Sequence, residues 1–86
     1  MIKLYRSDYF IQKYKELPQA MQEIVRKKLT LLSENPHHPS LRSGKLRGTD
    51  IFYSRINNDI RLTWWYYEEG ILLRNIGYHD QTLKNP

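Results

Sequence analysis

The sequence predicts an α+β fold in which a hairpin of two helices packs on one face of an antiparallel sheet. Before Pro36, apolar residues recur with the period of about 3.6 that is typical of helices. After Asp50 the period changes to about 2, which is typical of strands. The predicted elements follow the order βααβββ, and helices followed by consecutive hairpins indicate the α+β class.

The first half of the chain contains a short strand and two predicted helices. Residues 2–6 alternate as a strand does, and Ser7 or Asp8 then offers an oxygen to cap a helix over residues 8–16. A second helix begins at Pro18 and ends at Asn35-Pro36, because a residue before proline disfavours the helical conformation. The apolar residues at helical spacing are Phe10, Tyr14, Leu17, Met21, Val25, Leu29 and Leu32.

The second half contains a loop followed by three strands. Residues 36–50 carry two prolines and two glycines, so we expect a loop that Leu41 and Leu46 hold against the core. Segments 51–56, 60–67 and 71–77 are rich in β-branched and aromatic residues, and turn-forming residues separate them. These three segments therefore predict a meander of antiparallel strands.

Length and composition limit the possible functions. At 86 residues we expect a single domain spanning 1–86, and the absence of cysteine excludes disulfides and thiolate metal sites. The start lacks a signal-peptide pattern, and no segment approaches the about 20 apolar residues of a membrane span, so we expect a cytoplasmic protein without a membrane partner. The net charge of +5 indicates a polyanion or an acidic protein as partner.

The loop Asn57-Asn58-Asp59, taken as a three-residue hairpin loop, sets the register of the first hairpin. Arg55 then pairs with Arg61, and the neighbouring pairs are Phe52 with Trp64, Tyr53 with Thr63, Ser54 with Leu62 and Ile56 with Ile60. The side chains toward the helices are Phe52, Ile56, Ile60, Leu62 and Trp64, and those on the other side are Tyr53, Arg55, Arg61, Thr63 and Trp65. A shift by one residue would bury an arginine, which disfavours the alternative.

The last strand admits two registers. A three-residue loop ending at Gly70 places Leu73, Asn75, Gly77 and His79 on the arginine side but sends Arg74 to the core. A two-residue Glu69-Gly70 turn would correct Arg74 and move His79 away. We adopt the three-residue loop, because Gly70 then supplies the left-handed residue that such loops require.

The facing arginines repel each other by about 0.2 to 1 kcal/mol and need an anion nearby. That anion is either a carboxylate of Asp50, Asp59 or Asp80, or a phosphate, which guanidinium groups bind with paired hydrogen bonds. Together with the loop cations Arg42, Lys45 and Arg47, the rings of Tyr53 and Trp65 predict a surface for single-stranded nucleic acid. The alternative is an ordinary solvated sheet face.

Three short motifs, in this order and spacing, resemble one known family. They are Leu41-Arg42-Ser43-Gly44-Lys45-Leu46-Arg47-Gly48, then Tyr53-Ser54-Arg55-Ile56-Asn57-Asn58-Asp59-Ile60-Arg61-Leu62, and finally Ile76-Gly77-Tyr78-His79-Asp80. With the βααβββ order they are similar to the RelE/ParE superfamily of toxins from toxin–antitoxin systems. The resemblance covers nearly the whole chain.

The resemblance implies an mRNA interferase, a ribosome-dependent endoribonuclease that inhibits translation, with a cognate antitoxin, the ribosome and mRNA as partners. It implies that Arg61 holds the scissile phosphate, that His79 assists proton transfer and that Arg55 adds a further cation. The sequence departs from the family at Tyr53, where one branch has lysine, at Gly44, where another has a catalytic glutamate, and in its tail, which lacks a late tyrosine. ParE-like members share the fold but inhibit DNA gyrase and lack the nuclease residues.

Cutting RNA without a metal requires a base at the 2′-hydroxyl, an acid at the leaving 5′-oxygen and cations on the developing charge. Histidine can serve either proton role, so His79 is the candidate, and Asp80 either orients it or is a solvated charge. Lys45 and Arg47 would steer the RNA. His37 and His38 do not predict a metal site, because adjacent side chains point apart and no further ligands complete a site; we expect no cofactor.

Three functions stay open at this point. The first is the ribosome-dependent endoribonuclease, which the presence of both His79 and Arg61 favours. The second is a gyrase-directed toxin without nuclease activity, and the third is a basic binding module without activity.

Overall fold

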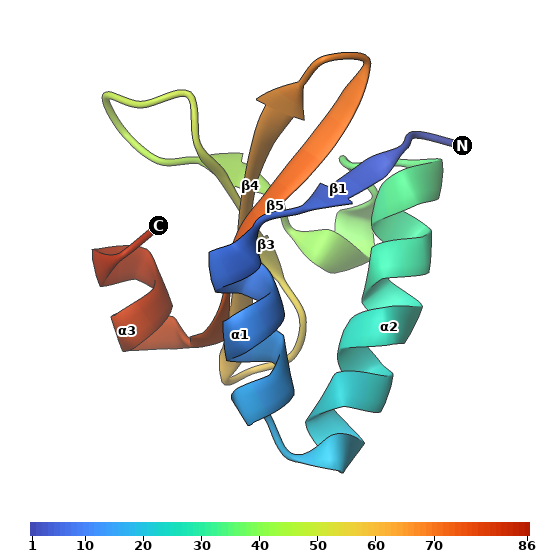
Figure 1. Cartoon of the computed structure of the whole chain (residues 1–86). Coiled ribbons are helices and arrows are strands. Elements are labelled where there is room, and N and C mark those ends of the chain that lie inside the picture. The colour runs from blue at the N-terminus through green and yellow to red at the C-terminus, as the bar shows by residue number, and fades with distance from the viewer.

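A computed structural model describes residues 1–86 of the chain and shows a five-stranded sheet with its helices around it (Figure 1). No helix has the length and apolarity that crossing a membrane requires. The elements in chain order are β1 (Leu4–Arg6), α1 (Asp8–Glu16), α2 (Gln19–Glu34), the 3-10 helix η1 (Pro39–Leu41), β2 (Gly44–Lys45), β3 (Phe52–Arg55), β4 (Ile60–Tyr67), β5 (Gly70–Tyr78) and α3 (His79–Lys84).

The sheet confirms the predicted α+β class but is mixed rather than purely antiparallel. Its strand order is β1-β5-β4-β3-β2. The first strand runs parallel to β5, from Leu4 opposite Ile71 to Arg6 opposite Leu73, and all other neighbours are antiparallel. Parallel neighbours need a long connection, and here everything from α1 to β4 provides it.

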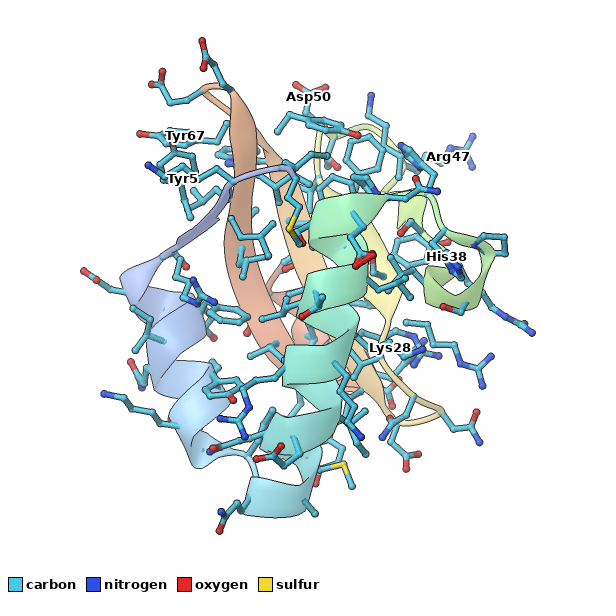
Figure 2. The ribbon with its side chains drawn as sticks, turned by 90° about the vertical axis from the view of Figure 1, so that its right-hand side faces the viewer. Tyr5, Lys28, His38, Arg47, Asp50 and Tyr67 are labelled. Atoms are coloured by element: carbon cyan, nitrogen blue, oxygen red, sulfur yellow. The ribbon has the colours of Figure 1, made fainter.

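Helices α1 and α2 lie on the same side of the sheet, as predicted (Figure 2). The hydroxyl of Ser7 accepts a hydrogen bond from the amide of Phe10 at 3.0 Å, which confirms the predicted cap of α1. Nε2 of Gln22 donates to the carbonyls of Tyr14 (3.1 Å) and Leu17 (3.0 Å), so the short connection between the helices is held by α2 itself.

The core lies between these two helices and the sheet. Apolar residues from the helices and their ends, each at most 7% exposed, meet apolar residues of the sheet that are almost completely buried. They are Phe10, Leu17, Val25, Leu29, Leu32 and, from η1, Leu41 on the helical side, and Ile56, Ile60, Leu62, Trp64, Ile71, Leu73 and Ile76 from the sheet and its loop. We call this side of the sheet the helix face. The opposite side, which carries Tyr53, Arg55, Arg61, Thr63 and Trp65, is called the Arg61 face.

The β3–β4 hairpin has the predicted register. Phe52 pairs with Trp64, Tyr53 with Thr63, Ser54 with Leu62 and Arg55 with Arg61. The amide of Ile56 donates to the carbonyl of Ile60 at 3.0 Å, which closes the loop of residues 57–59. Burial of Leu62 and Trp64 on the helix face fixes this register, because a one-residue shift would exchange them for charged and polar neighbours.

The turn before β5 differs from the prediction. Tyr67 pairs with Gly70, so that the loop contains only Glu68 and Glu69, and Glu68 adopts the left-handed conformation at φ 53°. A side chain on Gly70 would collide with the backbone oxygen of Lys3. Gly70 is therefore required for the close approach of β1 and not as the left-handed residue of the loop.

A β-bulge at Arg74 restores the register in the rest of β5. Thr63 pairs with Asn75 while Trp64 pairs with Leu73, so Arg74 is one extra residue in the strand. The bulge buries Leu73 completely and turns Arg74 outward, which means that the expected exposure of Leu73 and burial of Arg74 were wrong. An unpaired buried guanidinium costs far more than an irregular ladder.

Two segments are more regular than the sequence predicted. The expected loop of residues 36–50 contains η1 and the short edge strand β2, in which Gly44 pairs with Tyr53 and Lys45 with Phe52. Residues beyond Tyr78 form α3, which we did not predict. All three elements are too short to be stable alone, and contacts with the rest of the fold hold them.

A chain of hydroxyl groups connects the core with the segment around η1. Nε1 of Trp64 donates to Oγ of Ser54 at 2.8 Å, Ser54 and Ser43 share a hydrogen bond of 2.6 Å, and Ser43 donates to the carbonyl of Pro36 at 2.8 Å. A hydroxyl has only one hydrogen, and that of Ser43 is directed to Pro36, so Ser54 must donate to Ser43. The hydrogen bonds of this series therefore all run from Trp64 toward Pro36. They fix Ser43, which follows Arg42, and Pro36, which precedes it in the same segment.

Candidate functional site

Arg55 and Arg61 lie opposite each other at the end of the β3–β4 hairpin, as predicted. Both side chains are half-buried. Nη2 of Arg55 donates a hydrogen bond to Oδ1 of Asn58 in the connecting loop. Two guanidinium groups are thereby held at one end of the Arg61 face.

The Arg61 guanidinium is anchored on one side and free on the other. Nη1 donates to the carbonyl oxygens of Asn57 (2.7 Å), Asn58 (3.3 Å) and Ile60 (3.1 Å). All hydrogen bonds of this side chain within the protein start from Nη1, so Nε and Nη2 have no partner. Those two nitrogens form the fork that can bind two oxygens of a phosphate.

No carboxylate compensates the two arginines. The ion pairs of the protein connect Lys13 with Glu16, Arg26 with Glu23, Lys45 with Asp50 and His79 with Asp80. Asp50, Asp59 and Asp80 were candidates for this role, and none of them lies within 4.0 Å of either guanidinium. This end of the sheet therefore carries positive charge that an external anion would stabilise.

His79 begins α3 next to the same loop. Its amide donates to the carbonyl of Asp59 at 2.8 Å, and the preceding Tyr78 pairs with Ile60. The side chain is half exposed, and its Nδ1 lies 3.0 Å from Oδ1 of Asp80. The main chain thus brings His79 to the end of the sheet that holds Arg61, and Asp80 fixes one ring nitrogen.

The hydrogen bond from His79 lowers the pKa of Asp80 below its ordinary value, and the charge of His79 lowers it further. Any stabilisation from this contact is therefore present above the ordinary carboxyl range and is lost as the pH falls through the lowered pKa. We expect His79→Ala to raise the pKa of Asp80 toward its ordinary value in a ¹³C NMR titration of the carboxyl carbon. Lys84→Gln is the control, because the charge of Lys84 has the smallest effect on Asp80; an equal change in both variants would contradict the assigned contact.

The C-terminal residues cover the middle of the Arg61 face, which we expected to be open. Oγ1 of Thr63 donates to the carbonyl of Pro86 at 3.0 Å, and Nδ2 of Asn75 donates to the carbonyl of Asn85 at 2.8 Å. A side chain on Gly77 would meet Oγ1 of Thr82 at 2.9 Å, so glycine lets α3 pack closely. The end with Arg55, Arg61 and His79 is left uncovered.

The two aromatic candidates on this face, Tyr53 and Trp65, are both half-buried but have different neighbours. The ring of Tyr53 lies beside Gly44, where a side chain would meet its hydroxyl at 2.5 Å. One ring face of Trp65 is covered by the guanidinium of Arg74, with 3.9 Å between its central carbon and the ring centre. The Nε1 atom of Trp65 is buried without a partner, so Tyr53 is the better candidate for contact with a base.

The three loop cations do not gather on the Arg61 face. Lys45 pairs with Phe52 and therefore projects on the helix side at the sheet edge, where its Nζ lies 3.5 Å from Asp50. Arg47 is exposed on the same loop (Figure 2). Arg42 lies elsewhere, lining a hollow together with Lys28 and Arg55. The sequence did not single out Lys28, because it is one of several cations along α2.

His37 and His38 make separate contacts. The ring of His37 packs against Phe52 (6.2 Å between ring centres), and its Nε2 lies 3.3 Å from the hydroxyl of Tyr66. Nδ1 of His38 accepts from the amide of Ser40 at 3.1 Å and caps η1. Both side chains thus have structural contacts at the start of the 36–50 segment.

Comparison with known proteins identifies the fold. No protein-family model and no curated protein matches the chain. Among solved structures, a YoeB/ParE toxin from Agrobacterium tumefaciens superposes with a TM-score of 0.77, at 14% identity, over 91% of this chain and 99% of that one. The chain has the fold of the RelE/ParE toxins.

Two further structures with the RelE/ParE fold support this assignment. YafQ from E. coli has a TM-score of 0.76 at 15% identity, over 96% of this chain and 98% of that one. The archaeal RelE–RelB complex from Pyrococcus horikoshii gives 0.75 at 16% identity, over 93% and 97%. At such identities the comparisons establish the arrangement of the backbone, and the roles of side chains must be argued from this protein.

Proposed function

We propose that the chain is the toxin of a toxin–antitoxin system and that it cuts messenger RNA on the ribosome. The observation that carries this proposal is the free Nε and Nη2 fork of Arg61, held by loop carbonyls next to an uncompensated Arg55. A preorganised guanidinium of this kind suits the charge that develops on a phosphate under attack. The RelE/ParE fold supports the first part of the proposal, that the chain is a toxin.

In the proposed reaction, the 2′-hydroxyl oxygen of one nucleotide attacks the adjacent phosphorus. The bond from phosphorus to the 5′-oxygen breaks, which leaves a 2′,3′-cyclic phosphate and a free 5′-hydroxyl. The proton leaves the 2′-oxygen, and another is delivered to the 5′-oxygen. Arg61 would bind two phosphate oxygens, with Arg55 adding a second positive charge, and both charges favour the transition state over the ground state.

His79 is the residue that we assign to proton transfer. Its Nδ1 is engaged with Asp80, so Nε2 is the atom that remains for the RNA. In the neutral ring one nitrogen donates and the other accepts, and the partner of Nδ1 decides which. Lys45 and Arg47 would steer the RNA backbone toward the sheet from their loop, and Tyr53 would contact a base.

The proposal predicts dependence on the ribosome. The site offers one histidine and several permanently charged cations, whereas an independent metal-free nuclease needs a separate acid and base. We expect cleavage of mRNA on translating ribosomes to be at least about 10²-fold faster than cleavage of the same RNA alone, because the ribosome supplies orientation. Primer extension on mRNA from both reactions measures this ratio.

The control for this experiment is a ribosome-bound mRNA with a 2′-deoxy nucleotide in the decoding site, which should not be cut there. Rapid, metal-independent cleavage of naked RNA would contradict the ribosome dependence. If expression in growing cells stops DNA replication while translation continues, the gyrase-directed function is correct instead.

We also propose an antitoxin as the partner that keeps the protein inactive. In the archaeal complex, RelE is bound to RelB. This chain exposes two large aromatic side chains at the end of the sheet far from Arg61, Tyr66 (53% exposed) and Tyr67 (43%). Tyr67 contacts Tyr5 of β1, at 5.3 Å between ring centres (Figure 2). With the net charge of +5, such a surface suits an apolar and acidic segment that folds on binding.

A further inference from the structure

We propose that a hollow at the free edge of β3, formed by Lys28, Arg42 and Arg55, binds a second phosphate of the RNA backbone. The inference rests on the proposed function for the identity of the ligand, since an RNA at Arg61 is what places a further phosphate here. We call this hollow the Lys28 hollow.

Three separate elements build the Lys28 hollow. Lys28 comes from the middle of α2, Arg42 follows η1, and Arg55 ends β3. Ser40 and Asn57 contribute further polar groups to its wall. Figure 2 shows Lys28 on the side of α2 that faces the β3–β4 hairpin. Residues far apart in the sequence thus direct three cations to one place.

The protein itself does not neutralise these cations. None of the three has a carboxylate within 4.0 Å, since the cations in the ion pairs of the protein are Lys13, Arg26, Lys45 and His79. The guanidinium of Arg55 donates only to the neutral side chain of Asn58. Like charges around one hollow repel each other, so the arrangement favours an anion that binds all three.

The backbone of Arg42 gives an independent reason. Arg42 has φ 45° and ψ 45°, the left-handed conformation that glycine or asparagine usually adopts at the end of a helix. Its amide donates to the carbonyl of Pro39 at 3.2 Å, and the hydroxyl chain through Ser43 fixes the next residue. A long cation thus occupies a position at which its side chain is a conformational disadvantage, which indicates that the guanidinium is used.

The surroundings favour an RNA phosphate over an acidic protein segment. Ile56 is the single hydrophobic residue of the wall and is buried, so the hollow lacks the apolar pockets that anchor a peptide. Arg55 also stands directly opposite Arg61. An anion in the hollow and an anion at Arg61 would therefore be neighbours, as successive phosphates of one strand are.

The salt dependence of RNA binding tests this proposal. The probe is a short fluorescein-labelled oligonucleotide with 2′-O-methyl groups throughout, which the proposed reaction cannot cut, and fluorescence anisotropy gives its affinity at several salt concentrations. Each phosphate contact to a single strand contributes about 0.7 to the slope of log affinity against log salt. We expect Lys28→Gln with Arg42→Gln to lower that slope by about 0.7, the contribution of the one phosphate in the hollow.

Lys27→Gln is the matched control, since the neighbouring residue of α2 has the same charge and lies outside the hollow. Its slope should equal that of the wild type. Should Arg42→Gln disturb the fold in circular dichroism, Arg42→Gly removes the charge and relieves the left-handed backbone, and the same slope is expected. Wild-type slopes in the Lys28 and Arg42 variants, or an equal decrease in Lys27→Gln, would overturn the proposal.

Two further readouts separate the possible outcomes. The first readout is binding of polyglutamate as a model of an acidic protein. If the double variant keeps the wild-type salt dependence of RNA binding but loses affinity for polyglutamate, the hollow is a contact for an acidic protein and the proposal is wrong. If the double variant loses slope while Arg61→Ala still cuts mRNA at the wild-type rate, the Lys28 hollow stands and the nuclease assignment of Arg61 fails.

Discussion

Replacing Arg61 with alanine should lower the rate of mRNA cleavage on ribosomes by about 10²- to 10³-fold, because one preorganised donor to a developing charge is typically worth that much. Arg61→Lys should recover little of the activity, since a lysine keeps the charge but lacks the Nε and Nη2 fork. The measurement is single-turnover cleavage of mRNA on programmed ribosomes.

The fold should tolerate this change. The three carbonyls that bind Nη1 belong to the β3–β4 loop and its border and can turn to water, so we expect a loss of about 1 kcal/mol in the free energy of unfolding. Arg26→Ala is the matched control, because Arg26 pairs with Glu23 on the exposed side of α2. An Arg61→Ala protein with wild-type cleavage would remove the central argument for a nuclease.

Trp64→Ala should have the largest effect on stability, lowering the free energy of unfolding by about 3 to 5 kcal/mol. Trp64 is fully buried, and its ring stacks on Phe52 with 4.7 Å between ring centres. Truncation would leave a cavity and also a Ser54 hydroxyl without its donor. A loss of this size is a large part of the stability of any small domain.

Urea unfolding measures this effect through a shift of the midpoint at an unchanged slope. Trp64→Phe separates the two causes, because it keeps an aromatic ring in the core and loses only the indole donor and part of the volume. It should therefore cost clearly less than Trp64→Ala. A Trp64→Ala protein within about 1 kcal/mol of the wild type would show that the site collapses without a cavity.

The β3–β4 hairpin could be predicted from sequence because two constraints agree there. The loop Asn57-Asn58-Asp59 sets one register, and burial of Leu62 and Trp64 selects the same one. The opposed pair of Arg55 and Arg61 follows from that register alone. This part of the candidate site is therefore encoded locally.

The rest of the site depends on contacts that local patterns do not contain. An inserted residue such as Arg74 leaves no periodic signal; the one indication was the conflict between Leu73 and Arg74 in the adopted register. Strand β2 and helix α3 are stable only where they pack against the sheet. Their local sequences therefore give only a weak signal for a strand or a helix. Lys28 meets Arg55 only through packing of α2 on the sheet, which no sequence spacing between them reveals.

The adjacent residues Trp64 and Trp65 provide a built-in pair of spectroscopic reporters. One indole N–H is buried on the helix face and bonded to Ser54, while the other is buried on the Arg61 face without a partner, under Arg74. Their two indole proton signals should therefore be well separated in an NMR spectrum. Solvent exchange of the Trp64 signal follows opening of the core, whereas the Trp65 signal responds when a ligand displaces Arg74 or Pro86. Two neighbouring residues thus report separately on the interior and on the functional surface.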